Sequence, residues 1–423
     1  MKKGLLVVFA VIFCCGMGYG QTLKTGVLVI GNGNNALGAS FQSANSGVKT
    51  TLLMETEDFE LSLGDAAQQR MASGLELRLW DKLKAAGGIK GSSREIRDSS
   101  SLKVDLQKVS ALLKSWDDSS KNLTIIRKAN WSKLKRSGRG WTVQFNDGKT
   151  LKAQMLVYAG DPARLKEILK LKEGLTLEEA GLLNETGGLQ WKPLNYNKLI
   201  YRTSVASGFS MDHTRANILS LYDLLVPGQE DLIWLNPTRE SIAAGQAAGA
   251  TAAYPVFFKR KDNIPNLKVI QGELINHRLS LIPFGDISPA DSSWKAAQFI
   301  GLSGFLKGTL TNGEFRFNPG QKVSTLEIKA PIKEFYYKSQ IWFDDYTAPE
   351  MTIAATLDLV CKVGNKAPVT TLAEVKKKWK TIYRFSTEFD PERVISRREF
   401  ALLLQDYLNP FNVNIDPTGR VVR

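Results

Sequence analysis

Apolar and polar positions near the start of the chain predict a strand, a turn, a helix and a second strand. A short apolar run at 27–30 meets a glycine at Gly31, and small residues then recur at four-residue steps. The helix that this spacing predicts would turn its small side chains toward a sheet. A second apolar run at 52–54 ends in a carboxylate, Glu55. The pattern predicts a βαβ unit and therefore an α/β fold with a parallel sheet.

The turn of this unit has the spacing of a dinucleotide-binding fingerprint, Gly31-x-Gly33-x-x-Ala36. Gly31 would allow the tight turn, Gly33 would let the backbone approach a pyrophosphate, and Ala36 would let helix and strand pack closely. The phosphates would lie on the helix N-terminus, where free N–H groups and the helix dipole favour negative charge. Glu55 follows at nearly the spacing, about 20 residues, expected of the acid that binds a ribose. The alternative is a glycine turn that serves folding alone.

Later apolar blocks predict the rest of this unit. The expected elements are helices at 68–86 and 104–116, strands at 123–127, 141–145 and 154–158, and a turn at 146–148. The strand at 154–158 follows a small β-element, which is where an α/β nucleotide-binding domain returns to its central sheet. The pattern therefore predicts one sheet with a short β-element attached.

Three motifs then follow one another along the chain. They are the fingerprint ending in Glu55, the Val-Tyr-Ala-Gly-Asp turn at 157–161, and a small-residue segment at 242–253 with the core Gly-Gln-Ala-Ala-Gly. In this order they resemble the motifs of secreted or envelope FAD-dependent oxidoreductases of the glutathione-reductase-like Rossmann superfamily. The resemblance implies a Rossmann-type FAD/NAD(P)-binding domain with a small β-element, and FAD as the cofactor.

The resemblance also implies which residues bind the cofactor. Gly160 and Asp161 take the place of the family's Ala-Thr-Gly-Asp turn, and the Gly-Gln-Ala-Ala-Gly helix points its N-terminus toward the flavin. The cofactor-binding residues so implied are Gly31, Gly33, Ala36, Glu55, Gly160, Asp161, Gly245, Gln246, Ala248 and Gly249. For the last four, a small-residue helix that packs against a sheet is the alternative.

Two departures from the family pattern oppose cofactor binding. The family carries a Gly-Gly turn soon after the ribose-binding acid, whereas this chain has Thr-Glu-Asp-Phe-Glu at 56–60. Carboxylates near a pyrophosphate repel it unless they point into solvent. The segment between Asp161 and Gly245 is also short for the family. A second hypothesis is therefore a non-catalytic descendant that serves as an envelope or polysaccharide binding protein.

The sequence does not identify catalytic residues. His213 and His277 are the two histidines, the side chains that titrate near neutral pH without a special environment. His213 lies in a polar segment that could face a substrate, and His277 lies in an amphipathic stretch at 269–281, where we expect a structural role. Metal-ligand spacings, a P-loop and a serine-nucleophile elbow are absent from the sequence. Since a flavin supplies the electron chemistry itself, redox activity on a small-molecule substrate, such as a carbohydrate-related one, stays open.

The first twenty residues predict export. Two lysines precede an apolar run at 5–13, and small residues at 18 and 20 precede Gln21. This pattern is typical of a cleavable signal peptide at 1–20, so we expect a secreted or periplasmic protein. The run is about half the ~20 residues of a transmembrane helix, and no later run is long enough, so no transmembrane segment is expected. Lipid attachment at Cys14 or Cys15 is the alternative.

The formal net charge of +14 raises the question of a nucleic-acid partner. The best nucleic-acid candidate is the basic stretch at 127–139 around Trp131. We expect no nucleic-acid partner, because an exported protein seldom meets nucleic acid and the stretch lies beside a predicted hairpin. Acidic glycans or an anionic envelope surface suit this charge better. Cys361 is the one cysteine beyond the signal, so we expect no internal disulfide and a buried thiol.

The last part of the chain contains an internal repeat. Residues 317–328 align without gaps on 389–400. In each copy a serine, Ser324 or Ser396, could cap a helix, with a glutamate three residues later at the capping-box position. The repeats resemble S-layer-homology repeats, which implies attachment to cell-envelope polysaccharide. The alternative is a helical module that packs on the preceding domain.

These observations predict three parts. Residues 1–20 form the signal peptide, residues 21–263 form a Rossmann-like FAD-binding domain, and residues 264–423 form a mainly helical domain with S-layer-homology-like repeats. The function that they favour is an FAD-dependent oxidoreductase.

Overall fold

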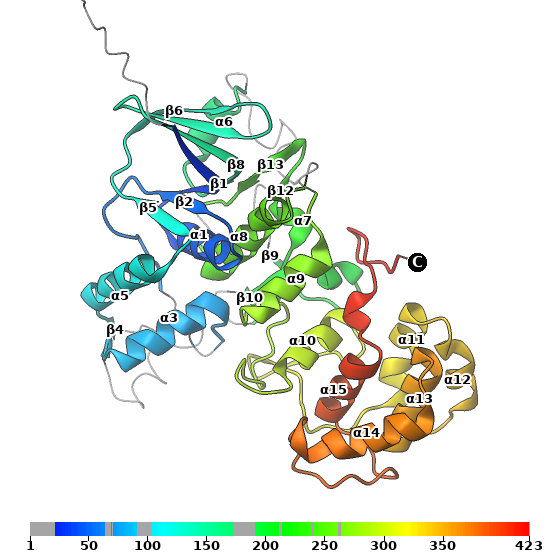
Figure 1. Ribbon diagram of the computed structural model, residues 1–423. Helices are drawn as coiled ribbons and strands as arrows, with labels where there is room; N and C mark the ends of the chain where they lie inside the picture. The colour runs from blue at the N-terminus through cyan, green and yellow to red at the C-terminus, as the bar shows by residue number, and fades with distance from the viewer. Residues whose placement is uncertain are drawn as a thin grey trace, which may run out of the picture.

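The computed structural model describes residues 22–63, 69, 71–90, 103–171, 191–210, 214–237, 240–260 and 264–422. A predominantly parallel sheet forms the centre of its first half (Figure 1). The strand order is β12 (Leu225–Val226), β13 (Gln229–Trp234), β8 (Thr150–Tyr158), β1 (Thr22–Ile30), β2 (Thr50–Leu53) and β5 (Leu123–Ile126). All neighbours on this path are parallel except β12 and β13. The sheet confirms the predicted α/β fold with a Rossmann-type domain.

The central strand β1 explains why the chain opens with an unbroken apolar run. It pairs with β2 on one side and with β8 on the other, and residues 27–30 are all buried. A parallel strand in the middle of a sheet is covered on both faces, so its buried residues do not alternate with polar ones.

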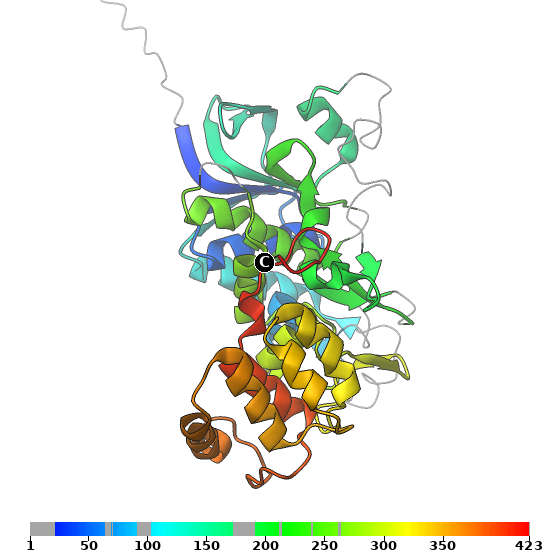
Figure 2. The same ribbon diagram turned by 90° about the vertical axis from the view of Figure 1, so that its right-hand side faces the viewer.

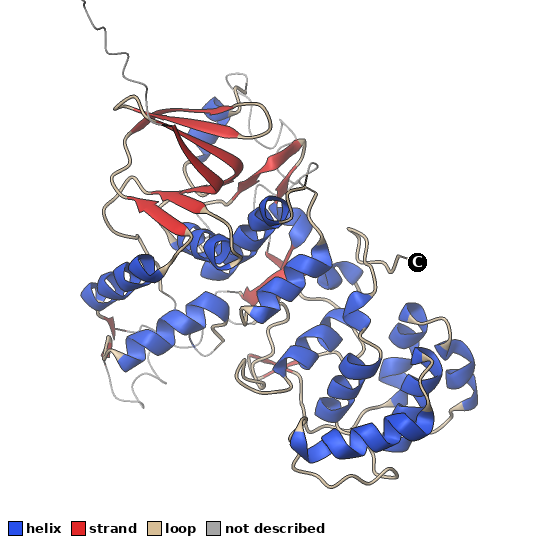
Figure 3. Cartoon of the chain, viewed as in Figure 1, coloured by secondary structure: helices blue, strands red, loops and turns tan. Residues whose placement is uncertain are grey.

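Helices α1 (Asn34–Asn45) and α8 (Ile242–Phe257) pack on each other and on the sheet (Figure 3). Glycines make this contact unusually close. A Cβ atom at Gly38 would lie 2.3 Å from the carbonyl oxygen of Ile242, and one at Gly249 would lie 2.4 Å from that of Ala39. The two backbones therefore touch where side chains would normally separate them. Helices α3 (Gly74–Ala85) and α5 (Leu106–Ser119) complete the connection from β2 to β5, close to their predicted ranges.

The predicted small β-element is an antiparallel meander. It consists of β6 (Trp131–Arg136), β7 (Trp141–Phe145) and the first half of β8. We did not predict β6 as a strand, because its basic residues suggested a solvated face. The structure shows both properties at once, since Trp131 and Leu134 are buried while Lys133 and Lys135 are exposed.

Between β8 and α8 the chain forms short elements beside the sheet. They are α6 (Pro162–Ile168), β9 (Trp191–Pro193), the 3-10 helix η1 (Leu199–Thr203), β10 (Ser204–Phe209), β11 (Ala216–Ser220) and α7 (Leu221–Leu224). Strands β9, β10 and β11 form a small antiparallel sheet. A further two-stranded pair, β3 (Ile89–Lys90) and β4 (Lys103–Val104), lies between α3 and α5.

The second half of the molecule is mainly helical, and Figure 2 shows its helices between residues 325 and 407 at the end opposite the large sheet. Its elements are α9 (Leu267–Asn276), α10 (Trp294–Ser303), β14 (Thr309–Thr311), β15 (Glu314–Arg316), α11 (Thr325–Phe335), α12 (Ser339–Asp345), α13 (Ile353–Gly364), α14 (Pro368–Thr381), α15 (Arg397–Tyr407) and the 3-10 helix η2 (Pro410–Asn412). Cys361 is buried on α13, as expected. A buried arginine ties the two halves together, since Arg202 of η1 donates to both carboxylate oxygens of Glu334 on α11, at 2.7 Å each.

Three loops meet in a closed ring of backbone hydrogen bonds at the start of α11, α13 and α15. The Val323 N–H donates to the Ile395 carbonyl at 3.1 Å, Ile395 donates to Met351 at 2.9 Å, and Met351 donates back to Val323 at 3.0 Å. The sequence predicted two copies of this unit, and the structure adds a third around Met351. The resemblance to S-layer-homology repeats stays a prediction.

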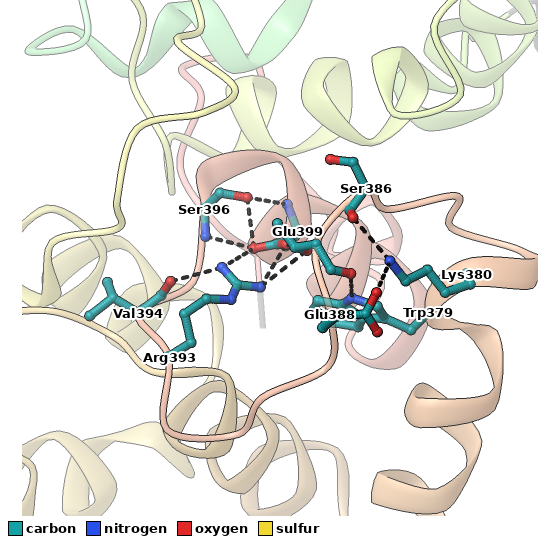
Figure 4. Close-up of polar contacts among 9 residues, drawn as sticks. Trp379, Lys380, Ser386, Glu388, Arg393, Val394, Ser396 and Glu399 are labelled. Atoms are coloured by element: carbon teal, nitrogen blue, oxygen red, sulfur yellow. Dashed lines mark hydrogen bonds and ion pairs between the residues drawn. The ribbon is translucent and has the colours of Figure 1, made fainter.

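Only one of the two predicted capping boxes forms. The Ser396 hydroxyl accepts from the Glu399 N–H, while the Glu399 carboxylate accepts from the Ser396 N–H at 2.9 Å (Figure 4). At the start of α11, however, Ser324 makes no capping hydrogen bond. The predicted box at Ser324 is therefore wrong. The Glu327 carboxylate accepts instead from the Arg397 guanidinium at 2.8 Å and from the Lys307 N–H at 2.8 Å.

Several predictions fall on residues outside the described ranges. They are the signal peptide at 1–20 with Cys14 and Cys15, the mature start at Gln21, and His213. The boundary between 263 and 264 also borders such a gap. In the described part of the chain, no helix combines the length and the apolar character that crossing a bilayer requires.

Candidate nucleotide site

The glycine turn lies where β1 and β8 end side by side. Gly31 has φ +149°, and a Cβ atom on it would lie 2.7 Å from the Ala159 carbonyl oxygen, so a side chain has no room there. From β1 the chain crosses to β2 on one side, and it later returns to β8 on the other. The crevice at such a reversal of strand order is the place where open α/β sheets bind ligands.

A cavity of about 300 Å³ opens at this point. It is lined by five of the residues predicted to bind the cofactor, namely Gly31, Gly33, Glu55, Gly160 and Asp161. Charged residues that we did not predict also line it: Glu60, Arg164 and Glu240. Within the part of the chain that the structure describes, four carboxylates and one guanidinium thus line the cavity.

The N-terminus of α1, the predicted phosphate site, already has a carboxylate on it. The Asn35 N–H donates to Glu240 Oε2 at 2.6 Å. A Cβ atom on Gly33 would lie 2.7 Å from the same oxygen. The second glycine of the fingerprint therefore permits the close approach of a carboxylate from the segment before α8. Burial raises the pKa of Glu240, and the Asn35 N–H opposes that rise.

Glu55 lies at the end of β2, as predicted, and its carboxylate pairs with Arg164 of α6. The guanidinium of Arg164 lies 3.4 Å from the ring centroid of Trp131, so it is held from two sides. The Glu55 N–H donates to Asn32 Oδ1 at 3.0 Å, which fixes the end of β2 against the glycine turn. A ribose hydroxyl would therefore share Glu55 with an arginine.

The acidic segment at 56–60 points in several directions. Glu57 pairs with Lys128 at 3.1 Å, and Asp58 accepts from the Ser110 hydroxyl at 2.7 Å. Glu60 is the exception, because it lines the cavity and its N–H donates to the Asn32 carbonyl at 2.9 Å. Of the three acids suspected of repelling a pyrophosphate, only Glu60 therefore lies on the cavity wall.

The turn after β8 is built by local contacts. Asp161 caps α6, with its carboxylate accepting from the Ala163 N–H at 2.9 Å. Tyr158 is buried and donates to the Asp161 carbonyl at 3.3 Å, and burial raises its pKa to about 12. A Cβ atom on Gly160 would lie 2.9 Å from the Tyr158 ring. Asp161 thus lines the cavity while it holds a helix start.

The four predicted residues of α8 lie within the protein interior. A Cβ atom on Gly245 would lie 2.2 Å from the Asn35 carbonyl oxygen, so Gly245 serves the contact between α8 and α1. Gln246 is fully buried; its side-chain amide nitrogen donates to Gln42 Oε1 at 2.8 Å, and its side-chain oxygen Oε1 accepts from the Leu75 N–H at 2.9 Å. Ala248 is buried too, as is Ala36 on α1. In this structure these residues hold α1, α3 and α8 together.

The described residues fit the adenosine half of FAD in part. The turn, the sheet edge and Glu55 have the required positions, but the helix N-terminus that would receive the phosphates holds the Glu240 carboxylate. Like charges at such a short distance repel strongly. FAD can bind there only when Glu240 leaves the Asn35 N–H, and the Glu240 carboxylate is the far end of a flexible side chain.

A larger cavity of about 540 Å³ lies on the other side of Arg164, between β6, β7 and α6. Trp131 and Trp141 line it together with basic side chains such as Lys135 and Arg136. This is the basic stretch singled out in the sequence. Arg164 separates this basic cavity from the acidic one.

Other candidate groups lie elsewhere. His277 follows α9, with its Nε2 3.2 Å from a carboxylate oxygen of Glu273. This hydrogen bond, the largest influence on that group, lowers the pKa of Glu273. Among the described side chains, no group of three or more His, Cys, Asp or Glu residues is placed to hold a metal ion.

Neither a protein-family model nor a curated protein matches this chain. Its fold is similar to the flavoprotein/dehydrogenase from Cytophaga hutchinsonii, with 16% identity and a TM-score of 0.25 over 36% of this chain and 43% of that one. It is also similar to the bacillithiol disulfide reductase from Staphylococcus aureus, with 13% identity and a TM-score of 0.22 over 33% and 39% of the two chains. A third similar structure is the thioredoxin reductase from T. acidophilum, with 13% identity and a TM-score of 0.20 over 32% of this chain and 34% of that one. The chain thus spans less than half the length of each structure, and the likeness concerns the fold alone.

Proposed function

We propose that this chain is an FAD-dependent oxidoreductase that binds the adenosine half of FAD at the carboxyl edge of its parallel sheet. The observation that supports this best is that three separate segments meet at one cavity. The glycine turn after β1, the acid at the end of β2 and the turn after β8 meet at one cavity, although they come from separate parts of the sequence. A turn kept for folding alone does not require an acid at the end of β2.

Each residue of this site would have a separate role in binding the cofactor. The backbone around Gly31 and Gly33 would admit the phosphates, and the Asn35 N–H would donate to them once Glu240 has moved. Glu55 would accept from a ribose hydroxyl, and Arg164 would keep that carboxylate oriented. When bound, FAD supplies the electron-transfer chemistry, and the protein supplies its position and electrostatic environment. The substrate we propose is a small molecule, with carbohydrate-related compounds as the first class to test.

The second candidate function is a non-catalytic descendant that binds cell-envelope polysaccharide. A specific observation favours it, namely that Glu240 lies on the phosphate site and that Gly245 and Gln246 are used in helix contacts. The ring of three loops in the helical half would then be the binding part. Under either candidate we propose export to the periplasm or beyond, with residues 1–20 removed.

Flavin binding separates the two candidates. We expect purified wild-type protein to be yellow or, after removal of FAD, to bind it in calorimetric titration. Gly33→Val should abolish this binding by blocking the close approach of the phosphates, and Glu55→Ala should weaken it by about 1.5–3 kcal/mol, the contribution of a hydrogen bond to a charged group.

The matched control is Gly320→Val, because an added Cβ atom there meets no atom within 4 Å. This variant should bind FAD like the wild type. Correctly folded wild-type protein that binds no FAD at any pH would overturn the oxidoreductase proposal and leave the polysaccharide-binding descendant.

A further inference from the structure

Glu240 takes the place of an external anion at the start of α1. The helix has no acidic residue in its first turn, and its N-cap residue, Gly33, offers no side chain. The first-turn N–H of Asn35 is instead satisfied by Glu240 Oε2 at 2.6 Å. Because helix N-termini favour negative charge, the carboxylate supplies what a phosphate would otherwise supply.

The rest of the cavity adds to the effect of this carboxylate. Glu55 is paired with Arg164, the one cation that lines the cavity among the residues the structure describes, so that guanidinium is not free to neutralise a phosphate. Glu60 and Asp161 lie on the same wall. The described lining is therefore net negative, so it would repel a pyrophosphate entering beside Glu240 but not an uncharged nucleoside.

We propose that Glu240 is a specificity-determining residue that competes with nucleotide phosphates for the start of α1. With Glu240 on the Asn35 N–H, the cavity accepts an uncharged nucleoside such as adenosine. A phosphate-bearing nucleotide binds only by displacing the carboxylate. This inference rests on the proposed nucleotide function and names the residue that controls it.

The competition predicts a pH dependence. Burial raises the pKa of Glu240, so the carboxylate takes up a proton more readily than an exposed one. Among the described residues, the charged groups that share the cavity with it are Glu55, Glu60, Asp161 and Arg164. A protonated Glu240 neither repels a phosphate nor holds the Asn35 N–H as strongly. The affinity for FAD should rise as the pH falls.

Calorimetric titration of two probes, adenosine and FAD, tests this proposal. The variants are Glu240→Ala, which clears the site, and Glu240→Gln, which keeps the shape and removes the charge. The control is Glu57→Gln, which removes a nearby charge that does not line the cavity and pairs with Lys128. Thermal melting of each variant verifies that it folds.

We expect both Glu240 variants to bind FAD at least tenfold more tightly than wild type at pH 8, with adenosine affinity changed less than twofold. Glu57→Gln should resemble wild type for both probes. The wild-type preference for low pH should disappear in Glu240→Gln.

Each other outcome is decisive. If all variants bind FAD equally, the competition is refuted while the proposed function stands. Equal gains in adenosine and FAD affinity would mean that Glu240 merely fills space, which also refutes it. Failure of every folded variant to bind either probe would overturn the proposed function and this inference with it.

Discussion

The two repeat serines provide a sharp test, because the structure gives them different roles despite their equivalent positions. We expect Ser396→Ala to destabilise the start of α15 by about 1 kcal/mol, the usual contribution of an N-cap serine. The same change at Ser324 should cost less than about 0.5 kcal/mol, as for a surface substitution that removes no particular contact. Ser324 is therefore the matched control.

The magnitude follows from the contacts of Ser396. Its hydroxyl donates to Glu399 Oε2 at 2.8 Å and accepts from the Glu399 N–H at 3.4 Å. Alanine removes both bonds and leaves the Glu399 N–H without its acceptor. The carboxylate itself stays satisfied, since Arg393 donates to it at 2.8 Å (Figure 4) and Thr387 donates to it at 2.6 Å. The loss should thus stay near 1 kcal/mol, well below the cost of an unpaired buried charge.

Hydrogen exchange is a suitable assay, because a chain of this size need not unfold in one step. Exchange of the amides in the first turn of α15 should accelerate about fivefold in Ser396→Ala. The first turn of α11 should show no such change in Ser324→Ala. Equal acceleration at both helices, or at neither, would refute our assignment of a single capping box.

Two further variants test other parts of the structure. Burial raises the pKa of Glu76 on α3 to about 7. Since the folded pKa exceeds the unfolded one, the stabilisation present below pH 4.5 should be lost as the pH rises through 7. The melting temperature of the wild type should therefore fall between pH 5 and pH 8, and it should fall less in Glu76→Gln. Gly249→Ala should lower the free energy of unfolding by about 1–3 kcal/mol, because its methyl group would lie 2.4 Å from the Ala39 carbonyl oxygen. The control is Gly320→Ala, and equal urea unfolding midpoints for the two variants would contradict the close helix contact.

The sequence predicted the parts of the fold that depend on nearby residues. The apolar run of β1, the glycine turn and the acid at Glu55 lie within one βαβ unit, and the structure reproduces it. Strand β6 was not predicted, because its two buried residues, Trp131 and Leu134, are separated by exposed basic and polar residues and do not alternate with them. The third loop of the ring escaped because Thr352 is followed at the third position by Ala355 instead of glutamate. Its equivalence with the other two loops is a property of backbone pairing.

The site was harder to predict, since its decisive contacts join distant residues. Asn35 and Glu240 lie 205 positions apart, and Glu55 and Arg164 lie 109 positions apart. No local pattern marks either partner. Glu240 directly precedes the N-cap of α8, and Arg164 lies in the first turn of α6, where each resembles an ordinary surface charge. The predicted signal peptide at 1–20 and the residues at 64–68 after the acidic segment lie outside the described ranges.

The glycine fingerprint therefore determines the geometry of the turn and does not by itself identify the function. Gly33 is needed wherever an anion approaches the start of α1, and the requirement is the same for a phosphate and for a carboxylate. In this chain the anion that approaches is Glu240, so the glycine has a structural reason to be present whether or not FAD binds. Whether the N-terminus of α1 is a cofactor site depends on its relative affinity for a phosphate and for the chain's own Glu240 carboxylate. Under the function proposed here, the exchange of Glu240 for a phosphate, more than the fingerprint itself, would decide whether FAD binds.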